Sequence, residues 1–271
     1  MDRTLTIVRI VLLSLLVLIL SGVLIIFMTK GFKFEFGQAE LIYDEVIKEE
    51  FDKIDIQTES LDIRFEKSNN EEVSVKIYDD KDNEPTVKVE DNTLKVISKN
   101  RKVVHFGLNF KKNEIVISLP ESLYDLVIDS KSGDITSPVD FKTISIKSTS
   151  GDIEVSSATD IDIKSTSGDI KVEEADNLTI ESTSGDIFVK KVNNKLNIES
   201  TSGDIKVSDL SLTDNSTIKA TSGDVTINSD SEDIYYDAHA TSGDIRIDNN
   251  NRHAEVELEI NTKSGDITVR N

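Results

Sequence analysis

The stretch 165-STSGDIKV-172 decides the fold, because 182-STSGDIFV-189 and 200-STSGDIKV-207 repeat it almost letter for letter. The triplet Ser-Gly-Asp recurs along the second half of the chain, with successive glycines 18, 17, 17, 18, 20, 20 and 22 residues apart. Its glycines are Gly133, Gly151, Gly168, Gly185, Gly203, Gly223, Gly243 and Gly265. A near-constant interval of this length indicates a repeat architecture in which every unit has the same corner.

Apolar residues alternate with other residues on both sides of each corner. Leu178 and Ile180 precede Gly185, while Ile187 and Val189 follow it, and one residue separates the members of each pair. This period of two predicts half-buried β-strands with side chains on opposite faces. A unit of two short strands and one corner cannot enclose a core alone, so we expect neighbouring units to stack.

Stacking of identical corners predicts an all-β fold, a β-solenoid whose coils lie about 4.8 Å apart. The alternative is a sandwich of antiparallel hairpins, which does not require the same corner in every unit. In a solenoid, the first and third residues after each triplet form two apolar ladders. The first ladder is Ile153, Ile170, Ile187, Ile205, Val225, Ile245 and Ile267. The second ladder is Val155, Val172, Val189, Val207, Ile227, Ile247 and Val269.

The triplet itself is predicted to be a structural turn. Glycine adopts positive φ without a steric penalty, so a glycine at every corner suits a repeated tight turn. The serine and aspartate beside it can hydrogen-bond to nearby backbone and stabilise that turn. This interpretation requires no cofactor, no metal and no catalytic residue.

A calcium array is the second interpretation, because stacked coils align the aspartates of the triplets into a ladder of carboxylates. Nonapeptide calcium repeats follow G-G-x-G-x-D-x-U-x, and this chain departs from them in having a single glycine per corner. The carboxylate ladder is Asp152, Asp169, Asp186, Asp204, Asp224, Asp244 and Asp266. A polysaccharide-acting enzyme is the third interpretation, although His105, His239 and His253, the three histidines, occupy no repeated position.

Composition excludes several classes of function. The net charge of −20 argues against binding of nucleic acid, because phosphate contacts draw on clustered lysine and arginine. The chain has no cysteine, which excludes disulfides, thiolate metal sites and a cysteine nucleophile. The connections between coils differ in length over 156–160, 173–177, 208–215 and 248–255, and variable loops of a solenoid often form its binding side, so we expect partners to bind there.

The first thirty residues differ sharply from the rest. The run from Ile10 to Met28 carries no charge over 19 residues, close to the ~20 that a helix needs to cross a hydrocarbon core. It exceeds the apolar core of a cleavable signal peptide, and no small-residue cleavage site follows it. We expect an uncleaved transmembrane anchor, with the acidic β-rich remainder outside the cell.

The predicted organisation has four parts. They are an anchor over 1–30, a linker over 31–50, a divergent β-rich cap over 51–125, and the solenoid over 126–271. The composition of 38-QAELIYDEVIKEEF-51 is typical of a helix, and we expect a short amphipathic helix or a stalk there.

Three further features of the cap and the terminus yield predictions. Residues 54-IDIQTESLDIRF-65 align without gaps with 161-IDIKSTSGDIKV-172, which predicts a degenerate coil with Leu61 at its corner. Segment 100-NRKVVHFGLNFKK-112 is the one basic stretch and the best candidate for contact with an anionic wall polymer or lipid. The last strand ends near Arg270 with no cap after it, so the C-terminal coil is predicted to offer an edge to a second copy.

In its recurring TSGDI and its N-terminal apolar segment, the chain resembles a bacterial family of membrane-associated β-strand repeat proteins. Members of that family are called adhesins, by inference from their fold, or LiaG-like proteins. The resemblance covers most of residues 40–271 and implies a link to the cell envelope and its stress response in Gram-positive bacteria. The family supplies no catalytic residues. Together these features predict a non-catalytic, membrane-anchored β-repeat module whose partner is a cell-envelope polymer or another membrane protein.

Overall fold

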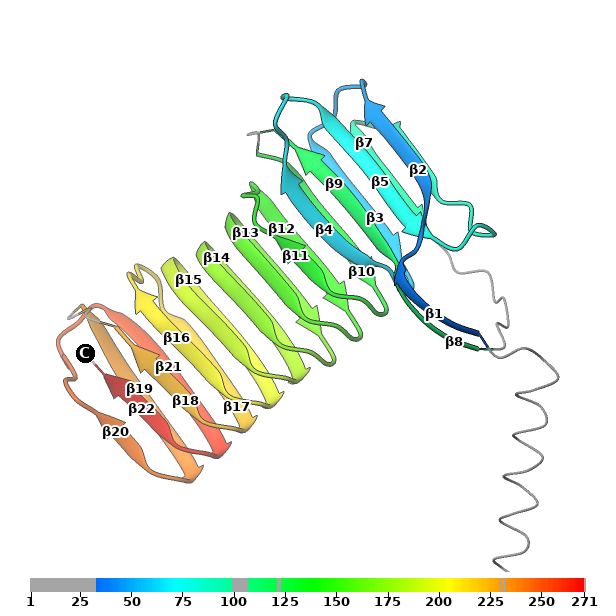
Figure 1. Cartoon of the computed structure of the whole chain (residues 1–271). Coiled ribbons are helices and arrows are strands. Elements are labelled where there is room, and N and C mark those ends of the chain that lie inside the picture. Colours follow the sequence, from blue (N-terminus) through cyan, green and yellow to red (C-terminus); the bar gives the residue numbers. More distant parts are fainter. Residues whose placement is uncertain (1–32, 99–106, 121–122, 230, 232, 271) are drawn as a thin grey trace, which may run out of the picture. The chain divides into compact units, whose positions relative to one another are not determined.

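The computed structural model describes residues 33–98, 107–120, 123–229, 231 and 233–270 (Figure 1). These residues form strands and turns, and none of them lies in a helix. Accordingly, that part of the chain contains no helix long and apolar enough to cross a membrane. The predicted anchor over 1–30 and His105 lie outside the described residues.

The strands fall into two units. In the smaller unit, β1 (Lys33–Gln38) and β8 (Gly107–Lys112) pair in parallel and in register. Every other described strand belongs to the larger unit, which contains the repeat.

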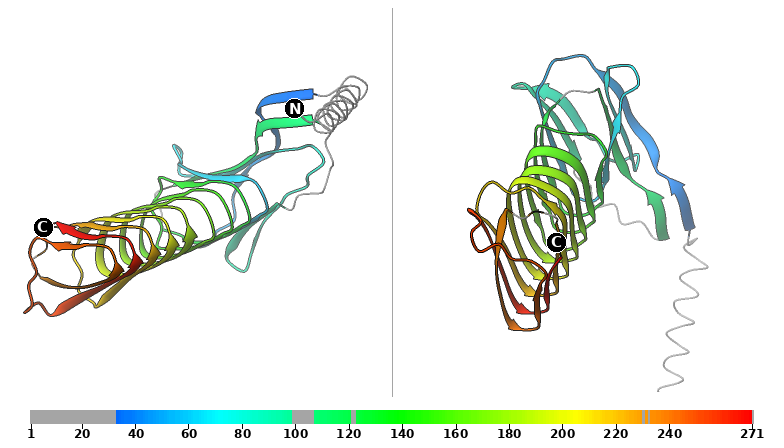
Figure 2. Two further views of the ribbon diagram at one scale, coloured as in Figure 1. Left: turned by 90° about the horizontal axis from the view of Figure 1, so that it is seen from below. Right: turned by 90° about the vertical axis from the view of Figure 1, so that its left-hand side faces the viewer.

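Parallel coils build the larger unit, which confirms the solenoid interpretation over the antiparallel sandwich (Figure 2). Strands β13 (Ile153–Ser165), β14 (Ile170–Ser184) and β15 (Ile187–Ser202) each begin after one corner and end at the next. Ile153 pairs with Ile170, and Ile170 pairs with Ile187, so equivalent residues of successive coils lie side by side.

Each coil contributes strand residues to two walls. The residues before each corner form what we call the leading wall, and the residues after it form the trailing wall. Strands β13, β14 and β15 run through both walls. Besides β13 to β15, the leading wall holds β7 (Thr93–Ser98), β3 (Lys53–Thr58), β10 (Asp125–Ser130), β12 (Thr143–Ser148), β17 (Ser216–Ser222), β21 (Val256–Ser264) and β19 (Ile234–Ser242). The trailing wall holds β9 (Glu114–Leu119), β4 (Asp62–Lys67), β11 (Ile135–Ser137), β16 (Ile205–Leu210), β18 (Val225–Asn228), β22 (Ile267–Arg270) and β20 (Ile245–Ile247).

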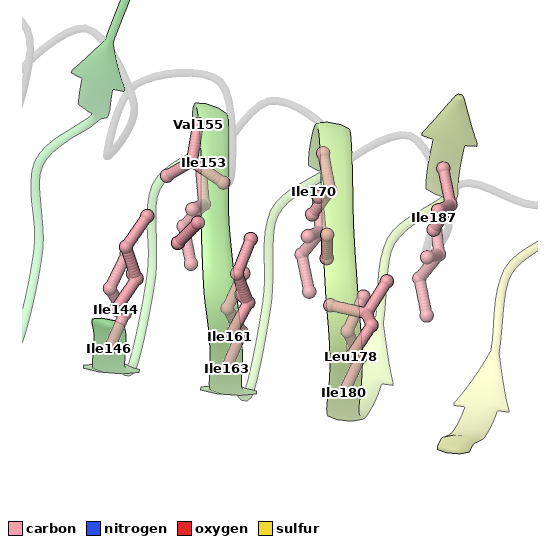
Figure 3. Packing of buried hydrophobic residues seen from close by; sticks show 14 of the residues in the cluster. Ile144, Ile146, Ile153, Val155, Ile161, Ile163, Ile170, Leu178, Ile180 and Ile187 are labelled. Carbon is pink, nitrogen blue, oxygen red and sulfur yellow. The ribbon is translucent and has the colours of Figure 1, made fainter. Parts of the chain in front are cut away.

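The apolar core lies between the two walls (Figure 3). Inward-facing residues such as Ile163, Leu178 and Ile180 are at most 1% exposed, and their neighbours along each strand face solvent. Burial of one such side chain stabilises the fold by about 1.5–3 kcal/mol. Both predicted ladders form, except that Ile245 is 43% exposed and Ile247 is only partly buried.

Residues 54–65 form the degenerate coil that the alignment predicts. Lys53 pairs with Asp125 and Ile63 pairs with Ile135, so this coil stacks directly on the first coil with a Ser-Gly-Asp corner. Leu61, at the corner, is buried and is not among the described residues with positive φ.

Antiparallel strands close this end of the larger unit. Strand β5 (Val73–Asp79) pairs antiparallel with β9, β2 (Glu40–Ile47) pairs antiparallel with β5, and β6 (Thr86–Glu90) pairs antiparallel with β7. The prediction of a short helix over 38–51 is therefore wrong. Helix propensity is a weak preference, and the open edge of β5 offers Glu40–Ile47 a ladder of backbone hydrogen bonds instead.

The last two coils are stacked in the reverse of their chain order. Strand β21 lies between β17 and β19, and β22 lies between β18 and β20. Strand β22 is paired on both sides, so among the described strands of these two coils the one-sided ones are β19 and β20; self-association through the C-terminal coil stays a prediction. Burial favours this order at one pair of equivalent positions: Ile260 of β21 is 0% exposed, whereas β19 holds only Ala238 there.

Candidate functional site

Every Ser-Gly-Asp corner brings its glycine against the preceding coil. At Gly185 φ is +112°, and an added Cβ would lie 2.1 Å from the carbonyl oxygen of Gly168. All eight corner glycines have φ between 110° and 141°, and their added Cβ atoms would come within 2.0–2.4 Å of a backbone oxygen. Glycine is required here both by the backbone conformation and by the close approach of neighbouring coils.

The corner aspartates bind the backbone of the next coil. Oδ1 of Asp169 accepts the N–H of Asp186 at 2.8 Å, and Oδ1 of Asp186 accepts the N–H of Asp204 at 2.8 Å. Eight such bonds of 2.8–3.0 Å run in one file through Asp62, Asp134, Asp152, Asp169, Asp186, Asp204, Asp224, Asp266 and Asp244. The file starts at Asp62 of the degenerate coil, so the acceptor role extends beyond the glycine-containing corners.

The seven aspartates of the predicted calcium ladder thus lie one per coil, with the order of the last two reversed. Within the described ranges, no group of three or more histidine, aspartate or glutamate side chains is placed to hold a metal ion. In each of these aspartates except Asp244, which ends the file, Oδ1 points to the next coil and accepts a backbone N–H there.

A different serine from the predicted one provides the hydroxyl at the corner. The hydroxyl of Ser165 donates to the carbonyl oxygen of Ser167, the triplet serine, at 3.3 Å. Ser130, Ser148, Ser182 and Ser200 make the same bond at 3.1–3.4 Å, and all five donors are buried. The triplet serine therefore contributes its carbonyl to the turn, and the buried serine two residues earlier contributes the side chain.

An open groove of about 730 Å³ runs along the outer face of the leading wall beside the corners. Two rows of outward side chains flank the buried serines. The first row is Lys147, Lys164, Glu181, Glu199, Lys219, Asn261 and His239. The second row is Thr149, Thr166, Thr183, Thr201, Thr221, Lys263 and Thr241. We call this surface the corner groove.

The corner groove is richer in lysine than the acidic chain as a whole. Four of its residues are lysines and two are glutamates. Lys164 pairs with Glu181 at 2.7 Å, and this bond raises the pKa of Lys164. Lys219 approaches Glu199 at 3.5 Å. The groove therefore offers hydroxyl, ammonium and carboxylate groups at a spacing of one coil, about 4.8 Å.

Of the two described histidines, His239 lines the groove and His253 does not. Nε2 of His239 lies 3.2 Å from a carboxylate oxygen of Asp237 at one end of the groove. His253 lies in the exposed connection between β20 and β21. Sequence reasoning missed the corner groove, although the threonine that precedes most Ser-Gly-Asp triplets was a visible signal.

A family model matches residues 51–270, the range that holds the degenerate coil and every Ser-Gly-Asp corner. The chain belongs to the Toastrack DUF4097 family. This Toastrack domain accounts for most of the larger unit described above, and the resemblance seen in the TSGDI repeat agrees with it. No curated protein matches the chain.

Several solved structures are similar to the chain. A protein from Parabacteroides distasonis ATCC 8503, described as a proposed lipid-binding protein, is 18% identical with a TM-score of 0.50, over 88% of this chain and 100% of its own. A proposed adhesin from Bacteroides fragilis NCTC 9343 is 21% identical with a TM-score of 0.48, over 86% of this chain and 99% of its own. The first of these likenesses supports a shared fold.

Proposed function

We propose that this Toastrack protein is a non-catalytic module that is anchored in the cell membrane, stands outside the cell and binds an extended envelope polymer along the corner groove. The observation that carries the proposal is the groove itself, in which an outward threonine lies in every lining coil except the one with Lys263, and a lysine or glutamate lies in most of them. A site that repeats at the strand spacing suits a ligand that repeats along its length, because many weak contacts add up through multivalency.

Support for the anchor comes from the uncharged run Ile10–Met28, and support for a surface role comes from the names of structural neighbours as proposed adhesins. The LiaG-like resemblance extends the proposal to an accessory role in the response to envelope stress. Lipid, named for the Parabacteroides distasonis protein, suits the polar lining of the groove less well than a hydroxylated polymer.

Two alternatives remain distinct from this proposal. A calcium-dependent surface module would use the second oxygen of each corner carboxylate, and it predicts a calcium-specific gain in stability. A polysaccharide-acting enzyme would need to turn over a wall glycan. Such enzymes use a single pair of acid and base residues, whereas the corner groove repeats similar side chains from coil to coil.

Cosedimentation tests the polymer proposal. The full chain in mild detergent is mixed with insoluble, protein-free cell-wall sacculi at physiological salt, and the bound fraction is measured against polymer concentration. Thr166→Tyr and Thr183→Tyr fill the groove, while Thr226→Tyr makes the same change on the outer face of the trailing wall. We expect wild type and Thr226→Tyr to bind and both groove variants to lose binding. No binding by the wild type, or equal binding by all four proteins, would refute the groove as the site.

A further inference from the structure

The two ends of the larger unit differ in how their strand edges are covered. Antiparallel strands close the end that holds the degenerate coil, as described above. At the other end, β19 pairs only with β21 and β20 pairs only with β22 among the described strands. We call the uncovered side of β19 and β20 the terminal edge. The missing neighbouring strand leaves Ile245 of β20 43% exposed, whereas Ile267, its partner on β22, is 0% exposed.

On β20, hydrogen bonds fix which backbone groups face outward. The N–H of Ile267 donates to the carbonyl of Asp244, and the N–H of Asp248 donates to the carbonyl of Val269. Asp244 and Asp248 therefore face β22. Because alternate residues of a parallel strand bond to opposite neighbours, Ile245 and Ile247 direct their N–H and C=O groups away from the solenoid.

On β19, the side chain of Asn250 marks the outward groups. Its amide donates to the carbonyl of Tyr236 at 2.9 Å and its oxygen accepts the N–H of Tyr236 at 3.0 Å. Tyr236 therefore faces outward, and by alternation so do Ala238 and Ala240. The side chain of Asn250 thus takes the place of a neighbouring strand at Tyr236. The outward backbone groups of Ala238 and Ala240 have no partner in the described structure.

The sequence of the terminal edge is complementary to itself. If a second copy pairs antiparallel with β19 about a two-fold axis at Ala238, then Asp237 of each copy lies opposite His239 of the other. A two-fold axis at Ile247 likewise sets Arg246 of each copy opposite Asp248 of the other. Opposite charges facing each other across strands, as at Arg246 and Asp248, are stabilising, and an imidazole N–H of His239 can donate to the carboxylate of Asp237.

One axis can serve both strands. Ala238 lies five residues before Gly243 and Ile247 lies four residues after it, the same positions that Ile180 and Val189 take around Gly185. A single axis perpendicular to both walls passes through both positions when they stand at the same level on the two walls. A two-fold contact uses the same surface on both copies and closes on itself.

We propose that the terminal edge binds a second copy of this chain, in an end-to-end dimer whose β19 and β20 strands pair antiparallel with their own copies. Unpaired strand edges are templates for pairing with another chain. The dimer supplies hydrogen bonds to the outward groups of Ala238 and Ile247 and covers Ile245. At Tyr236, the backbone of Ala240 from the second copy replaces the side chain of Asn250, which exchanges two hydrogen bonds for two. This proposal is independent of the polymer-binding function.

Sedimentation velocity of the full chain in density-matched detergent tests the dimer over a range of concentrations. Ala238→Pro removes an outward N–H at an edge position, where proline is tolerated within a sheet. Arg246→Asp sets two carboxylates opposite each other, and adding Asp248→Arg restores an opposite-charge pair in the same register. Thr226→Asp is the control for an added negative charge on the trailing wall.

We expect the wild type, Thr226→Asp and the Arg246→Asp/Asp248→Arg double variant to dimerise, and Ala238→Pro and Arg246→Asp to remain monomeric. Circular dichroism of each variant shows whether it is folded, and the charge swap gives an answer even if Ala238→Pro fails to fold. A monomeric wild type at every concentration would overturn the proposal. So would a dimer that persists in Arg246→Asp, or a double variant that stays monomeric.

Discussion

Replacing Gly185 with alanine should destabilise the protein through two separate effects. A non-glycine residue at φ +112° carries strain of about 1–3 kcal/mol. The new Cβ would also lie 2.1 Å from the carbonyl oxygen of Gly168, and relief of such overpacking costs a further ~1–3 kcal/mol. Alanine recovers about 0.4–1 kcal/mol because it restricts the unfolded chain. We expect a net loss of about 3 kcal/mol.

Urea unfolding followed by circular dichroism measures this loss. Ser184→Ala is the matched control, because it alters the adjacent exposed residue without adding an atom between coils. Surface changes of this kind usually alter the free energy of unfolding by less than about 0.5 kcal/mol. If Gly185→Ala lost no more than Ser184→Ala, neither the strained φ nor the close approach of the coils could be correct.

Three further perturbations follow from the same geometry. Asp186→Ala should cost about 1 kcal/mol in urea unfolding, because the N–H of Asp204 loses its acceptor, whereas Asp186→Asn keeps an oxygen there and should cost less; equal losses would contradict the carboxylate's role. Ser165→Ala should lose no more than about 1 kcal/mol, since Ala220 and Ala240 fill the equivalent position in other coils, and a loss above about 2 kcal/mol would show that the buried hydroxyl does more than bond to the turn. Hydrogen bonds from Lys88 and Lys95 lower the pKa of Glu90 from 4.5 to about 2. The stability that this carboxylate contributes is therefore present above pH 4.5 and is lost as the pH falls toward 2. Lys95→Met should raise the Glu90 pKa in an NMR titration, and an unchanged pKa would exclude Lys95 as a cause.

The regular part of the fold could be predicted because its information is local. Alternation around Gly185 specifies two strands, and repetition of the same corner specifies that the coils stack. The degenerate coil was visible for the same reason, since Leu61 replaces a glycine within an otherwise matching pattern. The structure adds the close approach of the corner to the preceding coil, which no single unit reveals.

The order of the last two coils could not be read from local pattern, because both units satisfy the same template. It depends on a comparison between distant residues: Ile260 buries more apolar surface between two coils than Ala238 would at the equivalent position. Strand β2 was missed on similar grounds, since its partner β5 lies more than twenty residues away. The corner groove also emerges only when separate coils align their outward rows.

The most direct test of whether the Ser-Gly-Asp corner is held by backbone bonds alone is thermal unfolding of the full chain in EDTA and in millimolar calcium, with magnesium as the control. Because every corner carboxylate except that of Asp244, at the end of the file, already accepts an N–H from the next coil, we expect the same midpoint in all three conditions. A ligand present at 100 times its dissociation constant stabilises the folded state by about 2.7 kcal/mol. A calcium-specific rise of the midpoint would therefore contradict the structural corner and make the aspartate file a metal site.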